Sequence, residues 1–144
     1  MTDNSPAHTE SRTPAFAWII LAGLGVVDFV RGFMHTFLVH YSASNIAGLD
    51  LTHSAQNQMF LLGIFGISNY LTGAIFLVIA FRARHLVPTI LALIPLTYAI
   101  GLIGLRLNAT PEAAFRGRTF MLIYMGVCVL TCVAAVICMR RKAA

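Results

Sequence analysis

The sequence predicts an all-α membrane protein, a four-helix transmembrane bundle with up-down topology. Of its 144 residues, 58% are hydrophobic and 10% are charged, which is too little polar surface to cover a soluble domain of this length. Four apolar runs each have the roughly 20 residues that cross a bilayer core of about 30 Å. Basic residues gather at the ends of these runs, where Lys and Arg orient helices in a membrane.

The four helices are expected at about residues 14–39, 59–81, 86–105 and 119–139. They form one membrane domain, residues 14–142, with no room for a separate soluble domain. Residues 1–13 are polar, rich in Ser, Thr and Pro and without periodicity, so we expect a disordered tail there. Pro95 lies inside the third run. We expect a kink but no break at this position, because neighbouring helices satisfy the backbone groups that a proline frees.

The distribution of basic residues predicts how the bundle is oriented. Six Lys and Arg residues flank the end that carries both chain termini, and three flank the opposite end. Basic flanks favour the cytoplasm, so both termini are expected there. The net charge of +5 is therefore a topology signal, which indicates the lipid bilayer as partner and no nucleic acid.

Three ionisable residues of the first run, Asp28, Arg31 and His35, lie inside the predicted span. Their i, i+3, i+7 spacing places them on one helix face. Each ionised group at a helix centre opposes insertion by roughly 2.5–3.5 kcal/mol. Asp28 and Arg31 can pair along the helix, and His35 is expected near the mouth of any outer pocket. Such residues are expected to point into the bundle.

The other three helices each carry a polar side chain at a similar depth. At about 1.5 Å per residue, Asn69 lies about 15 Å below the outer end of its helix, Tyr98 about 10 Å and Tyr124 about 8 Å. The three ionisable residues of the first run lie between about 16 and 6 Å below the outer end of the first helix. The six side chains thus define one polar layer in the outer half of the bilayer. This layer is either structural, fixing helix register, or a ligand-binding pocket, and the sequence leaves both open.

Gly66 and Gly73 form a small-residue stripe on the second run, with Asn69 between them. In lipid, glycine allows the backbones of neighbouring helices to approach closely. We expect this stripe to be the seam against the first helix.

The sequence predicts no metal site and no cofactor. His35 and His40 point about 140° apart on a continuous helix, so both cannot bind one ion without unwinding. The three cysteines lie in the last run without a CxxC pair, which disfavours thiol–disulfide chemistry. Walker, GxSxG and HExxH patterns are absent from the sequence, so an enzyme is disfavoured.

The first loop, "HYSASNIAGLDLTHSAQNQ", is the longest and carries no Lys or Arg. We favour a solvated outer loop. The alternative is that its apolar centre, "SNIAGLDL", folds back across the mouth of the bundle as a cap.

Four stretches, "VVDFVRGFMHTFL", "NIAGLDL", "FGISNYLTGAIFLVIA" and "IPLTYAIGLIGLRL", resemble the BphX-like family of small bacterial four-helix integral membrane proteins. The resemblance covers nearly the whole chain after the tail. It implies a multi-pass protein of the bacterial inner membrane, associated with the catabolism of hydrophobic aromatic compounds. It implies no catalytic residue.

Our leading hypothesis is a non-enzymatic accessory protein that binds, or helps to transport, a small amphipathic or aromatic molecule in the outer-half pocket. Arg31 is expected to hold an anionic or phenolic oxygen, and Asp28 to neutralise Arg31. Two alternatives stay open: a structural subunit of a larger membrane complex, and a quinone- or haem-linked membrane redox protein. Because four helices are few for a transporter, transport would imply a homo-oligomer.

Overall fold

The computed structural model describes residues 13–108 and 117–141. Its four long helices are α1 (Ala15–Thr36), α3 (Ala55–Arg82), α4 (Val87–Asn108) and α5 (Gly117–Arg141). The short elements between them are α2 (Val39–Tyr41), a π-helix (Ser42–Ala47) and a 3-10 turn (Arg84–Leu86). These two ranges contain no strand, and each long helix is long and apolar enough to cross a membrane. The chain is therefore a multi-pass membrane protein with the predicted all-α fold.

The helix boundaries differ from the predicted ones by a few residues. α3 begins at Ala55 instead of residue 59, because the polar residues before the apolar run continue the helix. α1 ends at Thr36 instead of residue 39, and the chain turns before α2 begins. α4 continues through Pro95 without a break, as predicted, while the kink stays a prediction. The predicted disordered tail lies outside the described residues except for Thr13, whose hydroxyl donates a hydrogen bond of 2.9 Å to the carbonyl of Arg84.

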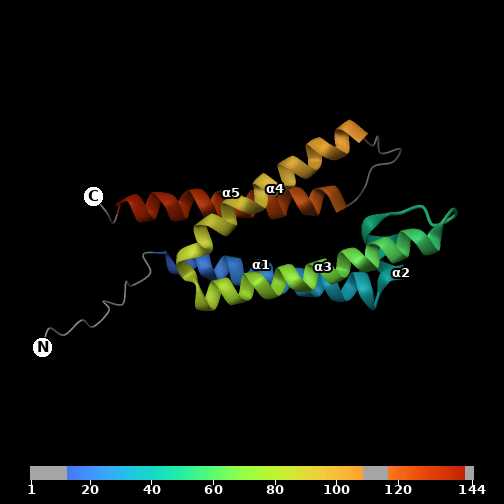
Figure 1. Ribbon diagram of the computed structural model, residues 1–144, viewed down its shortest axis with the longest axis horizontal. Coiled ribbons are helices and arrows are strands. Elements are labelled where there is room, and N and C mark those ends of the chain that lie inside the picture. Colours follow the sequence, from blue (N-terminus) through green and yellow to red (C-terminus); the bar gives the residue numbers. More distant parts are fainter. Residues whose placement is uncertain (1–12, 109–116, 142–144) are drawn as a thin grey trace, which may run out of the picture.

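The four long helices form two antiparallel pairs. α1 packs along α3, and α4 packs on α5, while fewer contacts join α1 to α4 and α5. Figure 1 shows the two pairs as two layers, with α4 running obliquely across α5. α1 begins and α5 ends at the same end of the bundle, as up-down topology requires (Figure 1). Little direct contact joins α3 to α4, so space remains between the layers.

The α1/α3 pair is held by backbone contact at two glycine pairs. A Cβ atom on Gly73 would lie 2.7 Å from the backbone oxygen of Gly25, and one on Gly32 would lie 3.0 Å from the backbone oxygen of Gly66. Side chains larger than a hydrogen atom would force the two helices apart at these points. The predicted glycine seam against the first helix is confirmed.

The first loop folds back over the end of the bundle opposite the termini. We name residues 39–49 the cap segment; it comprises α2, the π-helix and the two residues that follow. Ser42, Ala43 and Ala47 are buried, and Gly48 ends the π-helix in a left-handed conformation with φ of 67°. The solvated loop that we favoured is therefore wrong for this segment, because its small residues pack against the bundle. Tyr41 and Ile46 of the cap segment are exposed, as are most of the residues 50–54 that follow.

Candidate functional site

The ionisable face of α1 points into the bundle, as predicted. Asp28 is 3% exposed and His35 is 9% exposed, and the side chain of Arg31 is also largely covered. Gly25 and Gly32 hold the neighbouring face of the same helix against α3, so the rotation of α1 about its axis is fixed. This rotation turns the ionisable residues toward α4 and α5.

Asp28 connects the two helix pairs. Its Oδ2 atom accepts a hydrogen bond of 3.0 Å from the hydroxyl of Tyr124 on α5. Its Oδ1 atom accepts a longer bond of 3.4 Å from Nη1 of Arg31, one turn along α1. The carboxylate is therefore shared between a phenol from the opposite layer and a guanidinium from its own helix.

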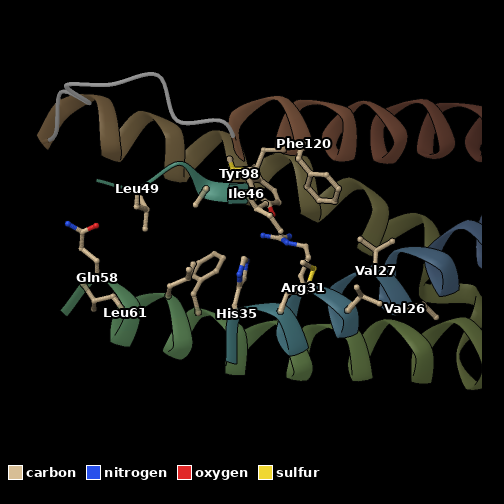
Figure 2. A pocket seen from close by; sticks show the side chains of 16 residues that line it. Val26, Val27, Arg31, His35, Ile46, Leu49, Gln58, Leu61, Tyr98 and Phe120 are labelled. Atoms are coloured by element: carbon tan, nitrogen blue, oxygen red, sulfur yellow. The ribbon is translucent and has the colours of Figure 1, made fainter. Parts of the chain in front are cut away.

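Arg31 has donors left over. A guanidinium carries five N–H groups, and the bond to Asp28 uses one of them. Its carbon also lies 5.6 Å from the ring centroid of Phe120 at the start of α5, a cation–π distance. The guanidinium lies in the space between the layers (Figure 2).

His35 contacts the cap segment instead of the Asp28 network. Its Nδ1 atom lies 2.6 Å from the hydroxyl oxygen of Ser42, and the pair is buried. His35 lies at the outer end of α1 and lines a cavity there, and the folded-back cap segment lies over its ring. The hydrogen bond ties the π-helix to the outer end of α1.

The polar residues of the other helices lie near Asp28, as the depth estimate predicted. Asn69 on α3 is 7% exposed, and its Nδ2 atom has no hydrogen-bond partner among the described residues. The rings of Tyr98 on α4 and Tyr124 on α5 pack with centroids 6.3 Å apart. All four long helices thus contribute a polar side chain at this level.

A cavity of about 740 Å³ lies between the two helix pairs, beneath the cap segment. Its walls are mostly aliphatic and aromatic side chains of α1, α3 and α5, with Ile46 and Leu49 of the cap segment. Arg31 and His35 project into it from α1, and Tyr98 faces them from α4 (Figure 2). We call it the main cavity; its size and its few polar groups are typical of small-molecule sites.

A second cavity of about 400 Å³ adjoins it between α3 and α4. Five of the six predicted site residues line this cavity: Asp28, Arg31, Asn69, Tyr98 and Tyr124. We call it the polar chamber. Two of these residues, Arg31 and Tyr98, also line the main cavity, so the two spaces share part of their walls. The predicted single pocket is therefore two adjacent cavities, with His35 in the main one.

Sequence reasoning missed three residues of the site. Ser42 belonged to a segment that we expected in solvent, and its partner His35 carried no sign of the contact. Phe120 stands at the beginning of a predicted span, where aromatic residues are common, so nothing marked it as a neighbour of Arg31. Gln58 lines the main cavity because α3 extends one turn further than its apolar run.

Among residues 13–108 and 117–141, no group of three His, Cys, Asp or Glu side chains is placed to hold a metal ion. Cys128 is buried in the core, and the thiol of Cys132 lies 3.6 Å from the carbonyl of Pro88.

Comparison of the chain with protein families, with curated proteins and with solved structures gave no match. The resemblance to the BphX-like family stays a prediction.

Proposed function

We propose that this chain is an integral membrane accessory protein that binds, or helps to move, a small amphipathic molecule. The observation that carries the proposal is the main cavity. It has a volume of about 740 Å³ and apolar walls, and the guanidinium of Arg31 projects into it inside the predicted bilayer. Ionisable residues within membrane spans are functional candidates by default. Arg31 has an internal counter-ion in Asp28, so the bundle tolerates the charge while keeping donors for a ligand.

The walls favour a ligand with a flat or branched hydrophobic body. Phe65, Tyr98 and Phe120 present aromatic rings, and valine and leucine side chains complete the lining. An oxygen on such a ligand would accept a hydrogen bond from Arg31. A hydrogen bond to a charged donor contributes about 1.5–3 kcal/mol, more than a bond between two neutral groups.

The ligand is proposed to arrive from the bilayer. Val26 and Val30 of α1 and Leu61 and Phe65 of α3 line the main cavity and are exposed. We propose that the cavity opens along these side chains, which a membrane would cover with lipid tails. Hydrophobic molecules dissolved in the bilayer therefore have a lateral route to Arg31.

The test is a binding measurement on the protein in nanodiscs, with 2-naphthol and naphthalene as fluorescent probes. We expect Arg31→Gln to weaken 2-naphthol binding about tenfold or more, since one charge-assisted hydrogen bond is lost. Naphthalene binding should not change. Asp28→Asn combined with Arg31→Gln is the matched variant that leaves no unpaired carboxylate, and Arg106→Gln, at the exposed outer end of α4, is the control. Equal 2-naphthol affinity in all four proteins would contradict the proposal.

A second candidate function is a subunit of a larger membrane complex, or a homo-oligomer. Gly101 and Gly104 on α4 have no atom within 4 Å of where a Cβ would stand, so they form a small-residue face that no described part of the chain covers. Such faces pack against other helices in membranes. Native mass spectrometry of the purified protein measures the copy number and any bound subunit. A quinone- or haem-linked redox role is the third candidate, and a visible absorption band on purification would support it.

We place the chain in the inner membrane of a bacterium with both termini in the cytoplasm. The resemblance to the BphX-like family supports the location, and the excess of basic residues at the termini supports the orientation. Labelling of single cysteines introduced at Ser54 and at Arg82, in a cysteine-free background, tests it. A membrane-impermeant reagent should label only the former from outside the cell.

A further inference from the structure

The polar chamber contains a buried donor that the described part of the chain does not use. Asn69 lies on the face of α3 between Gly66 and Gly73, where the seam with α1 fixes its position. More than nine-tenths of the residue is buried, and Nδ2 has no hydrogen-bond partner among the described residues. Because a buried N–H without a partner is costly, this amide is a candidate to bind the polar group of a ligand in the polar chamber.

The charges of the polar chamber are already balanced. Asp28 and Arg31 form an ion pair at 3.4 Å, and Tyr124 donates to the second carboxylate oxygen. An ionised ligand head would therefore add one uncompensated charge in a region of low dielectric, which is costly. An uncharged head group would bind without this cost.

The carboxamide of Asn69 selects the hydrogen-bonding pattern of that head. A primary amide offers donors on Nδ2 and an acceptor on Oδ1, so its complement both accepts and donates a hydrogen bond. Arg31 and Tyr98 line the main cavity as well as the polar chamber. A molecule whose body lies in the main cavity can thus extend its head past Arg31 toward Asn69.

We propose that the polar chamber recognises an uncharged head group that both donates and accepts a hydrogen bond, as a phenol or a primary amide does, and that it discriminates against carboxylates. This inference rests on the proposed function and decides between the phenolic and the anionic oxygen that the sequence left open. Asn69 binds the head directly, and Asp28 sets the discrimination by keeping Arg31 neutralised.

The experiment compares four naphthalenes at pH 7 in nanodiscs: 2-naphthol and 2-naphthamide, which are uncharged, 2-naphthoate, which is an anion, and naphthalene, which has no head. Wild type is expected to bind the two uncharged probes at least tenfold more tightly than 2-naphthoate. Asn69→Leu should weaken 2-naphthol and 2-naphthamide about tenfold and leave naphthalene unchanged, which also shows that the variant is folded.

Asp28→Asn is the variant that tests the charge balance. It leaves Arg31 without its counter-ion, so 2-naphthoate affinity should rise at least tenfold, and it should rise relative to 2-naphthol affinity in the same variant. The inference is overturned if wild type prefers 2-naphthoate, if Asn69→Leu leaves 2-naphthol binding intact, or if Asp28→Asn does not improve 2-naphthoate binding. In each of these cases the ligand still binds, so the proposed function is judged separately by its Arg31 variants. Failure of all four probes to bind wild type would remove both.

Discussion

The hydroxyl of Tyr124 donates a hydrogen bond of 3.0 Å to Asp28, and this bond joins the two helix pairs across the middle of the bundle. Each pair has its own packing, α1 on α3 and α4 on α5, but contact between the pairs is sparse. A single polar bond at this level therefore has a large share in fixing how the layers meet. It also sets the shape of the polar chamber, since both residues line it.

Tyr124→Phe should destabilise the bundle by about 1–2 kcal/mol. Interhelical hydrogen bonds in membranes contribute about 0.6 kcal/mol on average and up to about 1.7, and the upper end applies because the acceptor is a buried carboxylate. The measurement is reversible unfolding in mixed micelles. Tyr41→Phe is the matched control, because Tyr41 is exposed on the cap segment. A loss no larger than that of the control would show that the two layers do not depend on this bond.

Gly73→Ala should destabilise the protein by about 1–3 kcal/mol, whereas Gly104→Ala should be neutral or slightly stabilising. The new methyl group at residue 73 would stand 2.7 Å from a backbone oxygen of α1, and neither backbone can move without separating the pair. At residue 104 the methyl group meets nothing within 4 Å, and alanine has the better helix propensity. The same unfolding assay compares the two, and equal effects would contradict the glycine seam.

The four spans and the glycine seam were predictable because the bilayer imposes strict local rules. A span needs a minimum length of apolar sequence, and close helix packing needs small residues at regular spacing. Asn69 and Tyr124 could be placed near Asp28 by counting residues from the helix ends, since the rise per residue is constant. Each of these predictions depends on the sequence of a single helix and not on how the helices pack together.

What the sequence did not predict depends on how the helix pairs sit against each other. The split into a main cavity and a polar chamber arises because α3 and α4 diverge. No sequence pattern within either helix predicts this divergence. The fold-back of the cap segment depends on small residues such as Ala43 and Ala47, which are equally compatible with a solvated loop. The contact between His35 and Ser42 was not predicted, because Ser42 belongs to the cap segment, which we expected in solvent.

Thr52→Val should raise the pKa of Asp50 toward its ordinary value of 3.8. The hydroxyl of Thr52 donates a hydrogen bond of 2.7 Å to the carboxylate, and its backbone N–H donates one of 2.9 Å; both lower the pKa of Asp50. With a lowered pKa, the turn is stabilised above about pH 3.8 and loses this contribution as the pH falls through the lowered value. In the variant this contribution is smaller, because the pKa of the folded state lies closer to that of the unfolded chain. NMR titration of the Asp50 carboxyl measures the shift, and Thr52→Ser, which keeps the hydroxyl, should titrate as wild type does.

Ser42→Ala should loosen the cap segment without unfolding the bundle. The hydroxyl of Ser42 lies 2.6 Å from Nδ1 of His35, and it is the buried polar link between the π-helix and α1. Its loss should lower the free energy of local opening by about 1 kcal/mol, which corresponds to roughly fivefold faster hydrogen exchange. Hydrogen–deuterium exchange of residues 42–49 measures it, and the amide of Leu49, which donates to Ala43, is the reporter.

Ser44→Ala is the matched control for this prediction. The hydroxyl of Ser44 donates to the carbonyl of His40 and accepts from Nδ2 of Asn45, and both of these bonds are exposed and lie within the cap segment. Ile46 and Leu49 cover the main cavity, but the proposed route to it runs sideways from the bilayer, so the release of a bound naphthalene should not change in Ser42→Ala. Faster release together with faster exchange at residues 42–49 would mean that the ligand leaves through the cap segment, which would contradict the lateral route. Unchanged exchange in Ser42→Ala would show instead that the small buried side chains alone hold the cap segment in place.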